Sequence, residues 1–376
     1  MNDSLCCEVL GMIKQADTKS GLVQVLGTKG TDRDTWIALM ERLPSQKRDM
    51  HFHPDYMNVY ERTYGHKASL FVWEVGDGFV LFPFIVRPVP HQTETKNDLS
   101  SVYGFGGPLS NLQPEQIGDA GLREFWIALS SWIFEQGFVS EFCEISPFFQ
   151  DQQRQLLPAE ITARYRKDVV VADLTLPEET IWARIEERQR KAAGVARRRG
   201  VEISSSSLSD VELADFQARY LKTMENVDAS EFWRFPDDYF ANCRDCLGIE
   251  NVFLFNATVE GKIVASFFHV GMYDTLYYHF SCSDPVFRKY NPTSLLMVDS
   301  LIWAKAQGYK NFYMGGGRTT GRDSLFTFKN SFCHRTLPLY SYNRILDNAA
   351  YDMLCDSRGV TAEKTGEFFP AYRMAI

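Results

Sequence analysis

Residues 288–294 have types and spacing that could bind an anion. The predicted helix over residues 294–307 is preceded by Arg288. Its opening motif is Asn291, Pro292, Thr293 and Ser294. Proline in a first turn with Asn or Thr beside it is typical of a helix start, and unpaired N–H groups and the helix dipole both favour a phosphate there. The motif therefore predicts a phosphate site, although it could also serve only as a helix cap.

A glycine triplet, an aspartate and a lysine follow this helix. The triplet of Gly315, Gly316 and Gly317 comes after a predicted strand of residues 311–314. Such a triplet permits close approach of a ligand to the backbone, and it also suits a tight bend. Asp323 stands where an aspartate can cap a helix. Lys329 lies between Phe328 and Phe332, where a lysine is ordinarily expected to extend its ammonium group to water.

A cluster of basic residues lies on a predicted helix of residues 178–199. Its members are Arg184, Arg188, Arg190, Lys191, Arg197, Arg198 and Arg199. Guanidinium groups grip phosphate with two parallel hydrogen bonds. The alternative is a solvated face, because Glu186 and Glu187 can pair with Arg190 and Lys191 one helical turn away.

The elements that must position these residues occur twice in the chain. In the second half, residues 252–270 are two apolar runs split by a turn at Gly261, and residues 275–281 form an aromatic strand, so three strands are predicted before the helix. In the first half the predicted order is a hairpin around Gly78, an aromatic strand, a helix and a strand. These four elements cover residues 68–87, 101–105, 121–136 and 139–145.

The two halves also share local sequence. Trp132 is followed after three residues by Gln-Gly-Phe, and Trp303 is followed at the same spacing by Gln-Gly-Tyr. A repeat this long indicates a duplicated domain, and chance similarity of two helix ends is the alternative.

The composition is that of a globular, intracellular protein. The chain has 376 residues, 45% of them hydrophobic, and a net charge of −8. This charge argues against a broad nucleic-acid surface and leaves room for a local basic site. The start of the chain lacks a signal peptide, no run is long enough to span a membrane, and scattered cysteines suit a reduced cytoplasmic setting. Neither Cys243-x-x-Cys246 nor His51-x-His53 has further metal ligands nearby, so no metal site is predicted.

Several of these motifs, taken in order, resemble the Fem-like branch of the GNAT acyltransferase superfamily over roughly residues 50–340. The motifs are Tyr103-Gly-Phe-Gly-Gly-Pro108 after Asp98, Arg190-Lys-Ala-Ala-Gly-Val195, Asn291-Pro-Thr-Ser-Leu-Leu296, Gly315-Gly-Gly317 and Asp323-Ser-Leu-Phe-Thr-Phe-Lys329-Asn-Ser-Phe332. The resemblance implies an α/β (α+β) fold of two tandem GNAT-like domains, each a mixed, mostly antiparallel sheet flanked by helices. We expect the first domain at residues 1–168, the second, with the transfer site, at 169–345, and a tail at 346–376 that packs on the domains.

The resemblance also implies transfer of an activated acyl or aminoacyl group to a primary amine. It assigns the junction of donor and acceptor to the catalytic residues Phe328, Lys329 and Asp323. Lys329 would stabilise charge on the carbonyl oxygen, and Asp323 would orient Lys329 or the amine. The donor-binding residues would be Arg288, Asn291, Thr293, Ser294, Gly315, Gly316 and Gly317. The acceptor-binding residues would be Arg87, Tyr103, Arg188, Arg190, Lys191 and His279; for His279, a buried core histidine is the alternative.

The donor is left open between acyl-CoA and aminoacyl-tRNA. Acetyl-CoA enzymes of the superfamily use an Arg/Gln-x-x-Gly-x-Gly/Ala loop, whereas Arg288 to Ser294 contains no glycine. Fem-like relatives use aminoacyl-tRNA, so the end of a tRNA is a candidate partner. The expected acceptor is a small molecule or a cell-envelope or polysaccharide precursor, and no bound cofactor is expected. The alternative is a binding module that keeps the duplicated fold without catalysis.

Overall fold

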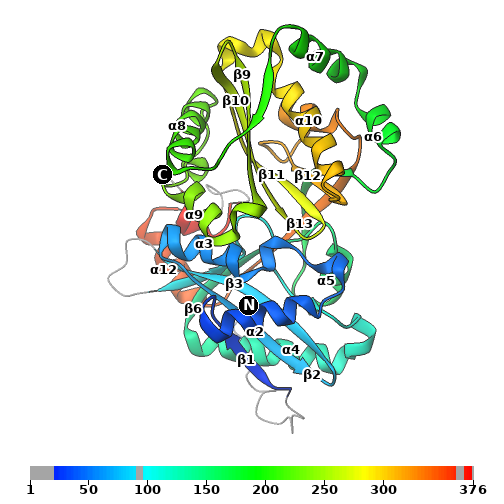
Figure 1. Cartoon of the computed structure of the whole chain (residues 1–376). Coiled ribbons are helices and arrows are strands. Elements are labelled where there is room, and N and C mark those ends of the chain that lie inside the picture. Colours follow the sequence, from blue (N-terminus) through cyan, green and yellow to red (C-terminus); the bar gives the residue numbers. More distant parts are fainter. Residues whose placement is uncertain (1–20, 90–95, 361–367, 375–376) are drawn as a thin grey trace. The chain divides into compact units, whose positions relative to one another are not determined.

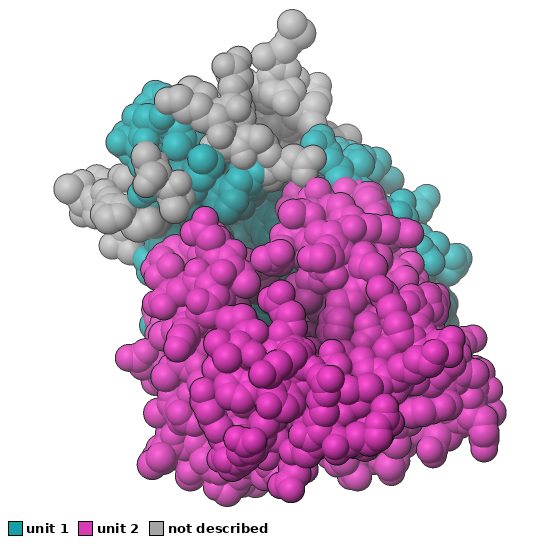
Figure 2. All heavy atoms as spheres, turned by 90° about the horizontal axis from the view of Figure 1, so that it is seen from above, with its two compact units in different colours: residues 1–47, 65–164, 340–376 teal, residues 48–64, 165–339 magenta. Residues whose placement is uncertain are grey.

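The computed structural model describes residues 21–89, 96–360 and 368–374. The chain forms two compact units, which Figure 2 shows in different colours. Unit 1 contains residues 1–47, 65–164 and 340–376, and unit 2 contains residues 48–64 and 165–339. Residues 48–64 thus group with the second unit, while the domain limits after residues 168 and 345 stay predictions.

Unit 1 is built on a mixed sheet in which one strand pair is parallel. The strands in spatial order are β1 (Val23–Leu26), β2 (Lys67–Val75), β3 (Gly78–Pro88), β4 (Asn97–Ser100), β6 (Phe138–Ile145) and β13 (Thr336–Ile345). Strand β13 pairs with β6 through Tyr340–Ile345, and the short β5 (Leu109–Ser110) pairs with β3. The pair β4–β6 is parallel, and helix α4 (Pro114–Gln136) comes between these two strands in the chain.

Unit 2 repeats the order of the six strands β1 to β13. Its spatial order is β8 (Glu202–Ser205), β9 (Val252–Val259), β10 (Lys262–Met272), β11 (Thr275–Ser283), β12 (Asn311–Gly315) and β7 (Arg164–Asp173). Here β11–β12 is the parallel pair, and helix α10 (Pro292–Ala306) comes between its strands in the chain. The predicted three-strand meander and helix are confirmed.

The order of pairing is identical in the two sheets: three antiparallel pairs, one parallel pair and one antiparallel pair. Helices α4 and α10 occupy the same place in this order. Both are followed by a glycine with positive φ, Gly137 at 68° and Gly308 at 87°. These glycines end the helices as the repeated Trp-x-x-x-Gln-Gly motif predicts, and the predicted tandem α/β architecture is confirmed.

Helices cover the sheet of each unit. In unit 1, α4 packs Phe125, Trp126 and Leu129 onto aromatic side chains of β2 and β3. In unit 2, α10 covers one face of the sheet, and α8 (Asp210–Asn226) and α9 (Tyr239–Leu247) cover the other, as Figure 1 shows. Complete burial of one large apolar side chain contributes about 1.5–3 kcal/mol, so these layers carry most of the stabilisation.

Seven further helices complete the described part of the chain. They are α2 (Gly30–Glu41), α3 (Pro54–Tyr64), α5 (Gln150–Gln155), α6 (Glu178–Arg184), α7 (Glu187–Arg198), α11 (Ser324–Asn330) and α12 (Asn348–Ser357). The 3-10 turns are η1 (Ser45–Lys47), η2 (Met50–Phe52), η3 (Glu231–Trp233), η4 (Ile249–Asn251), η5 (Pro285–Tyr290) and η6 (Ala371–Arg373). The tail elements α12 and η6 pack on Val89 and Val139 of unit 1.

Two predicted elements are wrong in their limits. The helix predicted over residues 178–199 is two helices, because Ile185 has an extended backbone and the next N–H, that of Glu186, donates to the carbonyl of Ser331. The strand predicted over residues 101–105 lies earlier, as β4, and residues 101–108 form a loop. Gly104 and Gly107 in that loop have φ values of 127° and 88°, which a regular strand does not adopt.

Candidate active site

The candidate site of unit 2 begins where β11 and β12 separate. These strands pair only from Thr275 to Tyr277, although β11 continues to Ser283. On its other edge, β11 has a bulge: Phe268 pairs with Phe280 and His269 with Tyr278, so His279 is skipped. A bulge bends its strand and re-aims nearby side chains. Strand β11 therefore leaves its parallel neighbour at the point where Tyr278 and His279 project to either side.

Lys329 lies inside this region. It belongs to α11 and is only 7% exposed. Its Nζ donates a hydrogen bond of 2.8 Å to the Gly316 carbonyl and lies 5.3 Å from the centre of the Tyr278 ring. In the described part of the chain Nζ forms no ion pair with a carboxylate. The lysine is thus buried and does not reach for water as an ordinary surface lysine would.

Burial sets the charge of this amine. Loss of water and, to a smaller extent, the charge of Lys167 lower the pKa of Lys329, and the charge of Asp323 partly opposes both, so that the pKa is about 7. A buried lysine loses its proton easily because the ammonium form is the one that burial penalises. Lys329 can therefore exist in both forms near neutral pH, which suits a group that must hold or release a proton during a reaction.

The glycine triplet forms the backbone beside Lys329. Gly315 has φ +75°, a conformation that favours glycine, and a Cβ on Gly317 would lie 2.4 Å from Asp323 Oδ1. The chain therefore bends at the triplet and other groups of the protein approach it closely, while its use in donor binding stays a prediction. One of these groups is Lys167 of β7, whose Nζ is 3.5 Å from the Gly317 carbonyl. Nothing in its sequence context singles out Lys167, since pairing of β7 with β12 brings it there.

Asp323 organises the turn that leads to α11. Its Oδ1 accepts from the N–H of Phe326 at 2.9 Å, and its Oδ2 accepts from the N–H of Arg318 and Thr319. Partial burial would raise its pKa, but these backbone donors hold the pKa of Asp323 below its usual value. Asp323 is thus the N-cap of α11, as its sequence context allowed, and its role in orienting Lys329 or the amine stays a prediction.

Phe328 packs at the edge of the core of unit 2. Its ring lies 5.1 Å from that of Phe332 in an edge-to-face arrangement, and its carbonyl accepts a 2.6 Å hydrogen bond from Ser331 Oγ. Phe328 therefore fixes the start of the last turn of α11, from which Lys329 projects.

The predicted donor residues divide into outward and inward groups. Arg288 is exposed on η5, and Asn291 adopts φ 55° at the start of α10 without a side-chain cap. Thr293 is partly buried. Ser294 points inward, because its Oγ donates to Gln189 Oε1 at 2.9 Å and the residue is 7% exposed. The first turn of α10 is consequently not capped by Asn291, and its use as a phosphate site stays a prediction.

The predicted acceptor residues of α7 pair with nearby groups. Arg188 forms an ion pair with Glu186 at 2.5 Å, and Lys191 pairs with Glu187 at 2.7 Å, both on the solvated surface. Arg190 instead donates to the carbonyls of Trp182, Ala183 and Ile185 at the end of α6. Free carbonyls at a helix end need such donors. Contact of these residues with an acceptor stays a prediction.

The position of Arg190 predicts a structural effect. Arg190→Ala should lower the free energy of unfolding by about 1–3 kcal/mol, because the carbonyls at the end of α6 lose a charged donor. Arg188→Ala should change it by less than about 1 kcal/mol, because exposed ion pairs contribute little. Urea unfolding of both variants measures this difference, and equal losses would contradict the structural role of Arg190.

Two further predicted acceptor residues, Arg87 and Tyr103, lie in unit 1. Arg87 Nε donates to Asp98 Oδ1 at 2.8 Å, and the fully buried Asp98 also accepts from Tyr372 and Arg373. Burial raises the pKa of Tyr103, so this hydroxyl stays protonated. Lys329 belongs to unit 2, and an acceptor role for Arg87 and Tyr103 stays a prediction.

His279 lies on the other side of β11 from Tyr278, as the alternation of the strand predicts. Its Nε2 is 3.2 Å from the Tyr239 hydroxyl and 3.5 Å from the Tyr56 hydroxyl. Burial lowers the pKa of His279 to about 3, with smaller contributions from His51 and His269. His279 is therefore neutral at neutral pH. This environment fits the alternative of a core histidine, and an acceptor role stays a prediction.

A buried polar group beside His279 was not found from the sequence. The Tyr277 hydroxyl donates to Asp49 Oδ2 at 2.7 Å, and Asp49 Oδ1 lies 2.6 Å from Nδ1 of His51. The short spacing Asp49-x-His51 was the available signal. Its partner, Tyr277, lies more than two hundred residues away, so only the fold reveals the arrangement.

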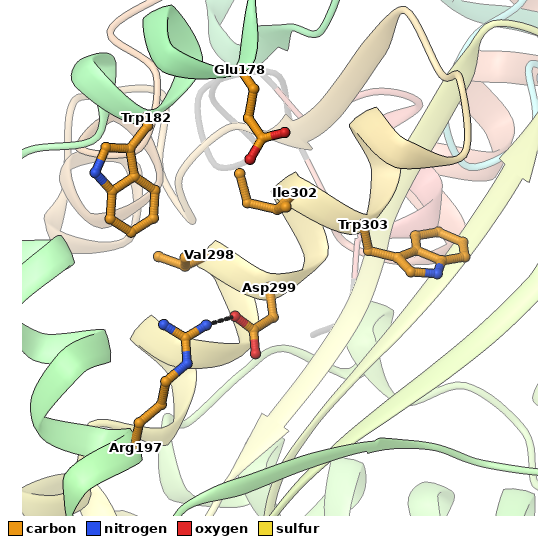
Figure 3. A pocket seen from close by; sticks show the side chains of 7 residues that line it. All are labelled: Glu178, Trp182, Arg197, Val298, Asp299, Ile302 and Trp303. Carbon is orange, nitrogen blue, oxygen red and sulfur yellow. Dashed lines mark hydrogen bonds and ion pairs between the residues drawn. The ribbon is translucent and has the colours of Figure 1, made fainter.

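A separate pocket of about 420 Å³ lies against α10 in unit 2. Figure 3 shows its lining, with Glu178 and Trp182 from α6, Arg197 from α7 and four residues of α10. The pair of Arg197 and Asp299 lies on its wall. Lys329 is not among its lining residues.

The described residues contain neither a metal-binding group nor a helix that could span a membrane. No set of three His, Cys, Asp or Glu side chains among them could hold a metal ion. In the same part of the chain, no helix has the length and apolar character needed to cross a bilayer.

The topology of unit 2, with its separating parallel strands and the helix between them, defines a GNAT acyltransferase fold. Residues 183–329 match the family described as Acetyltransferase (GNAT) domain. The predicted resemblance to the GNAT superfamily is thereby confirmed. No curated protein matches the sequence.

Solved structures with this fold span nearly the whole chain. FemX is similar with a TM-score of 0.66 and 12% identity, over 88% of this chain and 99% of FemX. A protein of unknown function from Bacteroides thetaiotaomicron has a TM-score of 0.54 and 14% identity, over 86% of this chain and 99% of its own. A tandem GNAT protein from the clavulanic acid biosynthesis pathway has a TM-score of 0.50 and 9% identity, over 86% of this chain and 99% of its own. At these identities the likeness establishes the fold.

Proposed function

We propose that this protein transfers an activated acyl or aminoacyl group to a primary amine, and that Lys329 is its principal catalytic residue. The observation that carries the proposal is the position of Lys329, which is buried beside the glycine triplet where β11 and β12 separate. The match of residues 183–329 to a GNAT acetyltransferase domain supports the reaction class. A buried amine that forms no ion pair has little structural value, because desolvation alone makes it unfavourable.

The proposed reaction is direct attack of the amine on the carbonyl carbon of the donor. The new C–N bond forms as the C–O or C–S bond of the donor breaks, and the proton that the amine loses passes to the departing oxygen or sulfur. Charge develops on the carbonyl oxygen during this step, and a positioned N–H donor stabilises it. Protonated Lys329 can supply such a donor if its Nζ turns from the Gly316 carbonyl to the substrate oxygen.

The donor is either aminoacyl-tRNA or acyl-CoA. Exposed basic side chains near the glycine triplet and at the start of α10 favour a donor with several phosphates; they are Arg288, Lys289, Arg318 and Arg322. The absence of glycine between Arg288 and Ser294 favours aminoacyl-tRNA. We propose an amine of a cell-envelope or polysaccharide precursor as the acceptor and the cytoplasm, where both donors are made, as the compartment.

Thermal unfolding with each donor tests this choice. We expect aminoacyl-tRNA to raise the melting temperature more than coenzyme A does, because the glycine-free turn lacks the loop typical of coenzyme A enzymes. A ligand at one hundred times its Kd stabilises by about 2.7 kcal/mol. Uncharged tRNA is the control for nonspecific binding of a polyanion. A larger shift with coenzyme A would reverse the choice of donor, and no shift with either would contradict transfer.

The second candidate is a binding module without catalysis. It is favoured by the enclosed state of Lys329 and by the inward position of Ser294. This candidate predicts that amine ligands bind while no donor changes the melting temperature. The donor experiment therefore separates the two functions.

A further inference from the structure

A buried polar side chain on α7 connects the two elements that carry the candidate chemistry. The Ser294 hydroxyl, in the first turn of α10, donates to Gln189 Oε1 at 2.9 Å. Gln189 Nε2 donates at 2.9 Å to Ser331 Oγ, at the end of α11. Ser331 Oγ in turn donates to the Phe328 carbonyl at 2.6 Å. The amide oxygen of Gln189 thus accepts a hydrogen bond from α10, and its amide nitrogen donates one to the residue that follows α11.

This connection lies in the interior of unit 2. Gln189 is 8% exposed, Ser294 is 7% exposed and Ser331 is fully buried. The other buried residues of α7 are Ala193 and Ala196, which pack in the apolar core. An apolar side chain at position 189 would suit such a face better than an amide, since burial of polar groups is favourable only when they are hydrogen-bonded. The amide therefore needs a reason beyond packing.

That reason is the geometry of α11. This helix has seven residues, and Lys329 and Ser331 lie in and just after its last turn. Helices this short have little stability of their own, so their position depends on tertiary contacts. Asp323 holds the beginning of α11, and the hydrogen bonds through Ser331 hold its end. The carbonyl of Ser331 also accepts from the N–H of Glu186, just before α7.

We propose that Gln189 is a positioning residue for Lys329, which fixes α11 against the first turn of α10 and so sets the lysine relative to the bound donor. This inference rests on the proposed function, because transfer is what makes the position of Lys329 matter. Gln189 itself does not touch the substrate. It acts through Ser331 and the Phe328 carbonyl, while Ser294 ties the same amide to the helix whose start is the predicted donor site.

Gln189→Leu removes both hydrogen bonds at similar side-chain volume. We expect α11 to loosen and Lys329 to become hydrated, so that the pKa of Lys329 rises toward its ordinary value. Lys329 can be acetylated with limiting acetic anhydride over a pH series, and mass spectrometry measures the extent of modification. The pH of half-maximal modification, the labelling midpoint, should rise by about one pKa unit or more. In transfer assays, kcat should fall about 10–100-fold while KM for the acceptor changes little.

Gln217→Leu is the matched control. Gln217 is another buried glutamine of unit 2, and its Nε2 donates to the Phe235 carbonyl on the α8–α9 side of the sheet. The labelling midpoint of Lys329 should stay unchanged in this variant. Ser331→Ala, which breaks the same connection with a smaller change, should shift the midpoint as Gln189→Leu does and serves if the leucine variant does not fold.

The labelling result needs no substrate, so it is independent of the proposed function. An unchanged midpoint in Gln189→Leu and Ser331→Ala would overturn the positioning role, and so would an equal shift in Gln217→Leu. Full transfer activity of a variant without Lys329 would instead overturn the catalytic role of Lys329, and the absence of binding by either donor would overturn transfer; both outcomes leave the labelling result intact.

Discussion

Lys329→Ala is expected to lower kcat for transfer by at least about 100-fold, because removal of one donor to a developing oxyanion typically costs that much. The loss should appear in kcat and in kcat/KM alike, since the interaction forms only in the transition state. Steady-state kinetics with a defined donor and amine, alongside circular dichroism to establish folding, provides the measurement.

The control for this variant is Lys310→Ala. Lys310 is a half-exposed lysine of unit 2 that pairs with Asp274 at 2.9 Å. Its removal should leave the rate within experimental error, because it lies on the surface away from the glycine triplet. Retention of full activity in Lys329→Ala would remove the assignment of the catalytic lysine, although transfer itself would then be established.

Lys329→Met is expected to stabilise the fold while it abolishes transfer. A lysine with a pKa of about 7 in the folded state and 10.5 in the unfolded state opposes folding at neutral pH. Each pKa unit is worth about 1.4 kcal/mol, so removal of the amine should raise the free energy of unfolding by on the order of 3–5 kcal/mol. Methionine keeps the length and apolar stem of lysine, so the core stays filled.

The pH dependence of this effect has a definite sign. Between pH 7 and pH 10.5 the unfolded chain holds the proton of Lys329 and the folded protein does not. Stability of the unmodified protein should therefore rise with pH across this window, relative to the methionine variant. The advantage of Lys329→Met should be largest below pH 7 and vanish above pH 10.5.

Denaturant unfolding of both proteins at several pH values provides the test, with Lys191→Met as the control. Lys191 is exposed and pairs with Glu187, so its replacement should alter stability by no more than about 0.5 kcal/mol. If the Lys329→Met variant is less stable than the unmodified protein at neutral pH, then the lysine stabilises the fold. Its desolvation would then not lower the free energy of unfolding as proposed.

A Lys329→Met variant that is more stable but inactive would indicate that Lys329 is retained for function and not for stability. Residues that reduce stability are retained where function needs them. A surface lysine would show neither effect, and a structural lysine would show destabilisation. The two Lys329 variants together therefore separate a catalytic group from a structural one.

Much of the fold could be predicted from the sequence, because its signals are short-range. Apolar alternation and the turns at Gly78 and Gly261 predict the two meanders, and the shared motif after Trp132 and Trp303 predicts the duplication. The structure confirms the two hairpins and the meander of the second half, and the strand order matches in the two units. The GNAT-type fold, predicted by resemblance, is likewise confirmed.

The arrangement around the candidate site could be predicted only in part. The sequence pointed to Lys329 and the glycine triplet, and the structure brings them into contact. The sequence could not show that Lys167 lies beside the triplet or that Ser294 points inward. These features depend on which distant strands and helices pack together, and local periodicity carries no information about such partners.

By itself, then, the sequence determined the repeated order of strands and helices, the glycine turns and the residue types near the candidate site, since each follows from local conformational preference. Only the tertiary structure decided that Lys329 is buried and that Gln189 joins α10 to α11. Burial and hydrogen bonding are the physical reason, because the pKa of an amine and the direction of an amide depend on neighbours that the fold brings from far along the chain.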